Sequence, residues 1–184
     1  MRTRDTRTGY GWISIALHWL TAIVVLTLWF VGSSINSDPA TQESSLRLHT
    51  SIAITAYVLL WARVIWRFKF RHPGPLPGQA GVFYQVGKYC HYGMCIAIGA
   101  MLISGPLMVW ARGDVIHVWD WFTIPGPIPT SMGFFDFVHG IHVWCSRFII
   151  VGTALHIGGV YKHAAFNQDG TFGKMLLPAR ESDN

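Results

Sequence analysis

Residues 139–163 read HGIHVWCSRFIIVGTALHIGGVYKH and place four histidines within one strongly apolar segment. An ionisable side chain in hydrocarbon is costly unless it has a partner there. On an ideal helix, which turns about 100° and rises about 1.5 Å per residue, His142 and His156 point within about 40° of each other and lie about 21 Å apart. The same geometry turns His139 about 100° away from His156, so we expect His139 at the surface. The segment therefore predicts a helix that carries two histidines on one face, at two depths.

The composition of the chain indicates a membrane protein. Of its 184 residues, 51% are apolar and only 12% are charged, against about 25% charged residues in soluble domains. A chain of this length cannot hide so much apolar surface in one small core. Four apolar segments are long enough for the roughly 20 residues that a helix needs to cross a bilayer, and they cover about residues 11–34, 46–66, 86–110 and 134–161. We therefore expect one all-α domain over residues 1–184, a four-helix transmembrane bundle in contact with lipid.

Lysine and arginine predict the orientation of these helices, because the cytoplasmic loops of membrane proteins are enriched in both. One side of the bundle carries ten basic residues, namely Arg2, Arg4, Arg7, Arg67, Lys69, Arg71, Lys88, Lys162, Lys174 and Arg180. The loops on the other side carry two basic and five acidic residues, namely Arg47, Arg112, Asp38, Glu43, Asp114, Asp120 and Asp136. Both termini are therefore expected in the cytoplasm. The net charge of +5 follows from this topology, so we expect no nucleic-acid partner.

Two features between and within these helices concern packing. The loop over residues 111–133 contains VWDWFTIPGPIPTSMG, which is typical of an aromatic belt at the membrane interface. We expect a short surface helix there, followed by a Pro-rich turn. In the third helix, Gly93, Gly99 and Gly105 recur every six residues. Such glycines allow the close approach of either a neighbouring helix or a flat cofactor, and the pattern leaves both open.

The depths of the histidines predict two metal-binding pairs. His18 near the start of the first helix matches His156 near the end of the fourth, on the cytoplasmic side. His49 near the start of the second helix matches His142 on the outer side. Two pairs about 20 Å apart, each from different helices, suit the bis-histidine ligation of two b-type haems, because a haem iron takes one axial ligand on each face. The chain has no Cys-x-x-Cys-His motif, which excludes covalently attached c-type haem.

Three arginines are candidates for binding haem carboxylates. Arg63 and Arg67 follow His49 by fourteen and eighteen residues, which places them near its helix face but at the cytoplasmic level. An arginine within the membrane needs a partner, and a propionate suits a guanidinium group. Snorkelling of Arg63 and Arg67 toward the headgroups is the alternative. Arg147 is the outer counterpart, although it is turned about 140° from His142.

Four motifs carry a family resemblance: ALHWLTA at 16–22, LHTSIAITAYVLLWARVIWR at 48–67, VGKYCHYGM at 86–94 with SGPLM at 104–108, and HVWCSRFIIVGTALH at 142–156. On these motifs the chain resembles the bacterial cytochrome b561 family over roughly residues 10–178. Members of this family are four-helix dihaem proteins linked to quinone. The resemblance implies a multi-pass protein of the bacterial inner membrane, with two haem b groups whose axial ligands are His18, His49, His142 and His156.

The resemblance also implies a quinone site near the cytoplasmic face. His91, which opens the third helix, and His163, which closes the fourth, would lie together there, with Lys88 as a nearby candidate. Neutral imidazoles can hydrogen-bond to quinone carbonyls and transfer protons during reduction. The substrate would be ubiquinone or another membrane quinone. A structural role at the interface is the alternative for His91 and His163.

Three functions are compatible with these features. The first is an oxidoreductase that moves single electrons between a periplasmic donor and quinone; some family members use superoxide as the donor. The acidic outer loops disfavour an anionic donor, although Arg47, Arg112 or Arg147 could provide a local positive path. The second is a membrane-anchor cytochrome b subunit, or an electron-transfer partner, of a periplasmic dehydrogenase, reductase or soluble cytochrome. The third, a non-haem metal or proton transporter, lacks the carboxylates expected within its helices.

Overall fold

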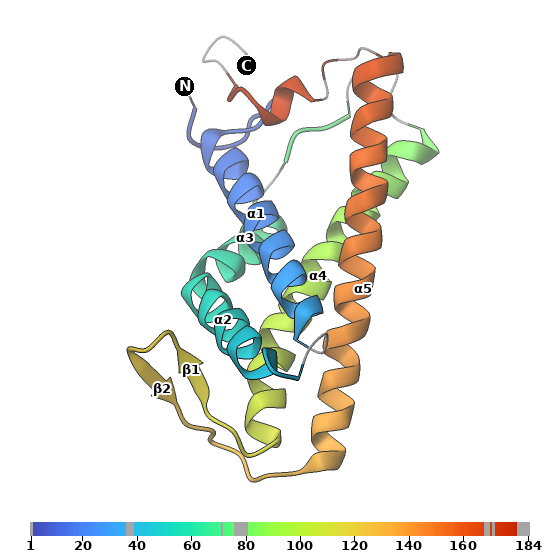
Figure 1. Cartoon of the computed structure of the whole chain (residues 1–184). Coiled ribbons are helices and arrows are strands. Elements are labelled where there is room, and N and C mark those ends of the chain that lie inside the picture. Colours follow the sequence, from blue (N-terminus) through green and yellow to red (C-terminus); the bar gives the residue numbers. More distant parts are fainter. Residues whose placement is uncertain are drawn as a thin grey trace.

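The computed structural model describes residues 2–35, 39–70, 72–75, 81–167, 170 and 172–179, and this part of the chain is mostly helical (Figure 1). Its α-helices are α1 (Trp12–Ser34), α2 (Gln42–Thr55), α3 (Tyr57–Lys69), α4 (Val82–Ala111) and α5 (Met132–Lys162). Between α4 and α5 lie the strands β1 (Ile116–Val118) and β2 (Phe122–Ile124). A π-helix (His163–Asn167) and a 3-10 helix (Gly173–Met175) follow α5. Outside the described residues lie three residues whose charges entered the topology prediction, Asp38, Arg71 and Arg180, and the loop residues 76–80.

Among the described residues, three helices, α1, α4 and α5, are long and apolar enough to cross a membrane, and the bent pair α2–α3 would make a fourth span if it counts as one. Large apolar side chains on these helices point away from the protein: Phe30 of α1 is 71% exposed and Leu155 of α5 is 68% exposed. Extended apolar surface of this kind marks contact with a membrane or another protein. The fold therefore agrees with a helical membrane protein.

The second apolar segment is not the single continuous helix that its sequence predicts. It is divided at Ala56 into α2 and α3, which are bent by 51° relative to each other. The hydroxyl of Thr55 donates a hydrogen bond to the carbonyl oxygen of Ser51 at 2.8 Å. A threonine that bonds back to the fourth residue before it often bends a helix. This local bond is a physical reason for the break.

The loop after α4 contains a β-hairpin instead of the surface helix predicted from its sequence. Its strands pair antiparallel, with Ile116 opposite Ile124. The hairpin is attached to α2: the Ser51 hydroxyl donates to the carbonyl oxygen of His117 at 3.3 Å and accepts from the backbone N–H of Trp119 at 2.7 Å. Trp119 lies in the tight turn and has a positive φ of 50°. Contacts with a distant helix thus favour strands where the aromatic sequence alone suggested a helix.

Helices α4 and α5 approach each other closely at two glycines. A side-chain carbon at Gly93 would lie 3.0 Å from the Phe148 ring, and one at Gly152 would lie 3.1 Å from the Met94 sulfur. Either carbon would force its neighbour to move. These glycines therefore permit helix packing.

Pro106 lies inside α4 without ending it. Because proline has no N–H, the carbonyl oxygen of Leu102 loses its usual helical partner. The Tyr57 hydroxyl donates to that oxygen at 3.3 Å and so links α3 to α4. One apolar cluster of the core lies around this contact and consists of Ala56, Leu60, Val64, Ala97, Ile98, Leu102 and Ile149.

The two ends of the described chain lie at the same end of the molecule, which we call the inner end (Figure 1). The backbone N–H of Ala179 donates to the carbonyl oxygen of Tyr10 at 2.9 Å, and the Trp19 indole donates to that of Met175 at 2.9 Å. The hairpin lies toward the opposite, outer end. The N-terminal segment and the segment after α5 therefore cover the inner end together.

Candidate functional site

Four histidines from three helices form two close pairs. His18 of α1 lies beside His156 of α5, with 6.0 Å between the ring centroids, and His49 of α2 lies beside His142 of α5, with 6.4 Å. We call His18–His156 the inner pair and His49–His142 the outer pair. The two ring planes are inclined by 74° in the inner pair and by 71° in the outer pair. The structure thus brings together the members of both predicted pairs, and α5 contributes one histidine to each.

The spacing within each pair fits an iron atom held between two imidazoles. A metal–nitrogen bond of about 2 Å on each side, with about 1.1 Å from each nitrogen to its ring centroid, gives roughly 6.2 Å between rings on opposite faces of a haem. His91 also lies near His156, but the 4.7 Å between these centroids is too short for that arrangement. The distances therefore favour His18 over His91 as the partner of His156.

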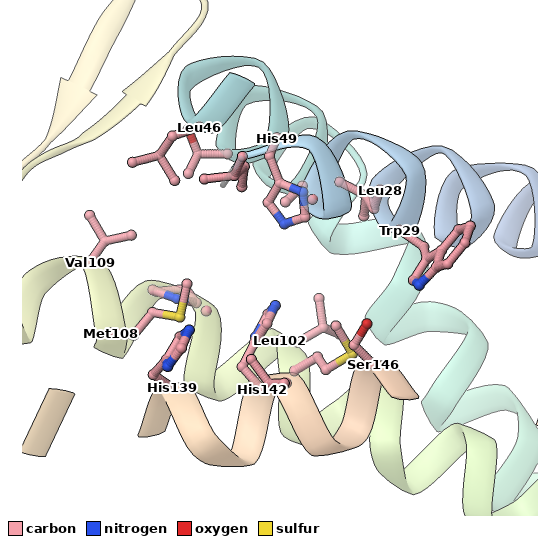
Figure 2. A pocket seen from close by; sticks show the side chains of 18 of the residues that line it. Leu28, Trp29, Leu46, His49, Leu102, Met108, Val109, His139, His142 and Ser146 are labelled. Carbon is pink, nitrogen blue, oxygen red and sulfur yellow. The ribbon is translucent and has the colours of Figure 1, made fainter. Parts of the chain in front are cut away.

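The outer pair borders a large cavity of about 890 Å³. Figure 2 shows the imidazoles of His49 and His142 on opposite walls of this space. The rest of the lining is largely apolar and includes Leu28, Trp29, Leu46, Leu102, Met108 and Val109. Cofactor sites are mostly apolar and typically have volumes of about 300–1,000 Å³. The size and lining of the outer cavity therefore suit a haem.

Small residues leave space around the outer pair. A side-chain carbon at Gly32 would lie 3.0 Å from Cε1 of His49, and one at Gly105 would lie 3.5 Å from Cε1 of His142. Nδ1 of His142 is 3.2 Å from the Ser104 hydroxyl, within hydrogen-bonding distance. Such a bond to one ring nitrogen orients the imidazole and leaves the other nitrogen for a metal. The glycine pattern in α4 thus serves both a helix contact, at Gly93, and a cofactor cavity, at Gly105.

A smaller cavity of about 50 Å³ lies at the inner end and is lined by Tyr10, Ser14, Arg63, Arg67, His72, His91 and Met175. Arg63 is only 8% exposed. Nε of Arg67 is buried and has no hydrogen-bond partner among the described residues, and its guanidinium group lies 4.9 Å from the ring centroid of Tyr92. Two guanidinium groups beside one cavity suit the binding of a carboxylate such as a haem propionate. The placement of both arginines fits this role better than snorkelling.

The arginines and histidine at the outer cavity are more exposed. Arg147 and Arg112 both line this cavity, and both are exposed. His139 is exposed as predicted, but it lines the same cavity as His142, and its ring stacks on that of Phe135 at 5.3 Å. The expectation that His139 points away from the site is therefore wrong. The outer cavity is wide enough that its lining includes His139 as well as His142.

The three candidates for a quinone site occupy different surroundings. His91 lies in α4, half-buried, between the inner cavity and His156. His163 is half-buried and opens the π-helix that follows α5. Lys88 is exposed on α4. The ring of His91 is next to that of His156, a member of the inner pair.

Sequence reasoning missed a buried acid–base pair at the inner end. Nδ1 of His72 lies 2.7 Å from Oδ2 of Asp5, and the two side chains are 9% and 3% exposed. The N-terminal segment folds back so that the backbone N–H of Gly11 donates to Oδ1 of Asp5 at 2.8 Å. Asp5 is the one acid in an otherwise basic N-terminal tail. This isolated carboxylate was the only sign in the sequence of an acid–base pair in the tail. Nothing in the sequence indicated that its partner would be His72.

Comparisons with known proteins identify the family of this chain. The family model described as prokaryotic cytochrome b561 matches residues 9–178. A protein of Escherichia coli (strain K12), cytochrome b561 homolog 2, is 32% identical over 181 residues, which are 96% of this chain and 95% of that protein. The chain therefore belongs to the prokaryotic cytochrome b561 family, membrane-bound b-type cytochromes that take part in electron transfer.

Proposed function

We propose that this cytochrome binds two haem b groups and moves single electrons between a periplasmic donor and membrane quinone. The observation that carries the proposal is the presence of two histidine pairs, with 6.0 and 6.4 Å between their rings, at two levels of α5. When bound, haem would supply a one-electron carrier at each level. The two levels lie about 21 Å apart along the helix, so the chain positions carriers near both faces of a bilayer.

We place the protein in the bacterial inner membrane with four spans, counting α2 and α3 as one. The excess of basic residues on the side of the termini supports a cytoplasmic inner end. The outer cavity and the hairpin then face the periplasm. All four spans belong to one domain over residues 1–184, because α5 pairs with both α1 and α2 through its histidines.

Each polar residue at the haem sites has a separate task. His18 and His156 would hold the inner haem, and His49 and His142 the outer one. Arg63 and Arg67 would bind the carboxylates of the inner haem, since both line the inner cavity. Arg147 has this role at the outer cavity, which it lines.

Quinone reduction is assigned to the inner end, at His91 with His163 and Lys88. The ring of His91 lies 4.7 Å from that of His156, so a quinone hydrogen-bonded to His91 would lie next to an axial ligand. An imidazole N–H can donate to a quinone carbonyl and pass on a proton. Ubiquinone or another membrane quinone would take two electrons and two protons to form the quinol, with the protons drawn from the cytoplasm.

The outer cavity would admit a small electron donor, and superoxide is such a donor. Arg112 and Arg147 line the cavity and would attract an anion, whereas Glu43 on the same lining opposes it. A second candidate function, a membrane anchor for a periplasmic redox protein, is favoured by the hairpin, because Trp121 is 78% exposed and Phe122 is 53% exposed. Exposed aromatic side chains are frequent at protein interfaces.

The experiment that separates these functions uses the purified, haem-loaded protein alone. With a source of superoxide and a short-chain ubiquinone, we expect quinol formation that stops when superoxide dismutase is added. No quinol under these conditions, together with the co-purification of a periplasmic redox subunit from the native membrane, would favour the anchor function. A purified protein without haem would contradict both functions.

A further inference from the structure

We propose that Asp5 and His72 form a proton-exchange site that supplies the inner cavity with protons from the cytoplasm. The inference rests on the proposed function, since protons are consumed at the inner end only if quinone is reduced there. It goes beyond that function in naming the residues through which the protons enter. In this proposal His72 transfers the proton, and Asp5 is a positioning residue that holds the His72 ring.

Both ring nitrogens of His72 lie within hydrogen-bonding distance of an oxygen atom. Nδ1 lies 2.7 Å from Oδ2 of Asp5, and Nε2 lies 3.2 Å from the carbonyl oxygen of Arg67. A carbonyl oxygen and an ionised carboxylate can only accept hydrogen bonds. Burial alone would raise the pKa of Asp5, but hydrogen bonds from His72, Ser14 and the Gly11 backbone lower it below its ordinary value. Asp5 is therefore ionised at neutral pH and accepts a hydrogen bond from Nδ1–H of His72.

The inner cavity lies between this pair and the quinone candidate. His72 lines it on one side and His91 on another, and its volume is about 50 Å³. A water molecule takes about 30 Å³ of liquid volume and needs two to four polar partners. The Tyr10 and Ser14 hydroxyls, together with two arginines, provide such partners. The cavity thus has room for a water that could pass a proton from His72 toward His91.

The charges that face His72 control the release of its proton into the cavity. The N-terminal segment contributes Asp5 and Tyr10, α3 contributes Arg63 and Arg67, α4 contributes His91, and the segment after α5 contributes the uncharged Met175. Burial raises the pKa of Tyr10, so its hydroxyl remains protonated and can donate or accept a hydrogen bond. The Asp5 carboxylate favours a proton on the ring nitrogen that faces it, and Arg63 and Arg67 pair with the carboxylates of the inner haem in the proposed function. Negative charge that appears on the quinone oxygens would tip this balance toward proton transfer.

The chemistry balances as follows. A quinone accepts two electrons from the outer donor, one at a time, and each of its carbonyl oxygens forms one O–H bond. For each O–H bond, an N–H bond of His72 breaks and its proton crosses the cavity. The N–H bond then re-forms with a proton from cytoplasmic water, while Asp5 holds the ring in place.

The test compares quinol formation by haem-loaded wild-type protein, Asp5→Asn and His72→Gly between about pH 6 and 9. The pH profile of the wild type should differ from those of both variants, because each variant lacks one member of the Asp5–His72 pair. At neutral pH both variants should be slower by about 100-fold, the lower end of the contribution of a positioned proton-transfer group. Added imidazole should restore His72→Gly but not Asp5→Asn, a rescue that a merely structural role would not give. The matched control, Asp120→Asn, removes an exposed carboxylate at the outer hairpin and should behave as the wild type.

The haem spectrum of each variant reports whether its fold is retained. If Asp5→Asn loses haem, Asp5→Glu replaces it in the test and should form quinol at close to the wild-type rate. Wild-type rates and pH profiles in Asp5→Asn and His72→Gly would overturn the inference alone. Absence of quinol formation by the wild type would instead overturn the proposed function, and the inference with it.

Discussion

His49 and His142 face each other across the outer cavity, with 6.4 Å between their rings and no side-chain carbon at either Gly32 or Gly105 to close the space beside them. One ring is carried by the short helix α2 and the other by the long helix α5. The position of α2 depends in turn on the bend at Ala56 and on the hairpin that binds Ser51. Elements far apart in the sequence therefore determine the geometry of one pair.

Removal of one histidine from α5 should remove one haem. We expect His142→Ala to lose the outer haem and His156→Ala to lose the inner one, because each would leave an iron with a single axial imidazole. The haem-to-protein ratio measured after pyridine extraction should fall by half in each variant, and the two should retain different components in a redox titration. His139→Ala, which removes an imidazole from the same cavity, should retain both haems. Loss of neither haem in the first two variants would refute the ligand assignment.

Two glycine substitutions should have unequal effects on the outer haem. At Gly32 a new carbon would lie 3.0 Å from the His49 ring, whereas at Gly105 it would lie 3.5 Å from the His142 ring, an ordinary contact. Both positions are helical, so both alanines gain about 0.5–1 kcal/mol of helix preference. Gly32→Ala should therefore shift the electron paramagnetic resonance signal of the outer haem or lower its occupancy, while Gly105→Ala should not. Equal signals in the two variants would show that the His49 ring does not need the space.

The hairpin should stabilise the outer half of the second span through Ser51. This side chain is 1% exposed, and its oxygen accepts the Trp119 N–H at 2.7 Å. Ser51→Ala should lower the free energy of unfolding by about 1–3 kcal/mol, because its hydroxyl loses two hydrogen bonds to the hairpin and the Trp119 N–H loses its acceptor. The exposed Ser44, whose hydroxyl donates to the Thr41 carbonyl, provides the control Ser44→Ala, which should change it by less than about 0.5 kcal/mol. Thermal unfolding in detergent measures both, and similar melting temperatures for the two variants would count against the hairpin contact.

The stability that Asp5 contributes should disappear in acid. Because its pKa is lower in the folded protein than the ordinary 3.8, its contribution is complete above about pH 4 and is lost as the pH falls through the lowered value. Breaking a buried ion pair costs about 3 kcal/mol, so Asp5→Asn should melt well below the wild type at neutral pH. Melting curves recorded at a series of pH values should converge in acid. A constant difference at all pH values would mean that the carboxylate charge is not the source of the stability.

The positions of the long helices and of the histidine pairs could be predicted from the sequence because both follow from regular helix geometry. Apolar runs of about 20 residues mark the spans, and a spacing of fourteen residues returns His156 to nearly the direction of His142. The ring pairs His18–His156 and His49–His142 lie together as this arithmetic predicts. These features depend on short-range periodicity, which a single sequence contains.

The remaining features depend on contacts between distant segments. The hairpin contacts the helix just before the break at Ala56 through two hydroxyl groups. The Ser51 hydroxyl accepts the backbone N–H of Trp119, and the Thr55 hydroxyl accepts the Trp119 indole N–H at 3.0 Å. The Asp5–His72 pair needs the N-terminal segment to fold back over the inner end. No periodicity marks such contacts, so a helix was expected where the hairpin lies, and His72 was not singled out.

A haem assay combined with a redox titration of the purified wild-type protein tests the central claim most directly. We expect two non-covalently bound b-type haems per chain, both low-spin with two histidine ligands, that titrate as two one-electron components. One haem per chain, or a high-spin signal from either haem, would contradict the assignment of His18 with His156 and of His49 with His142 as two ligand pairs.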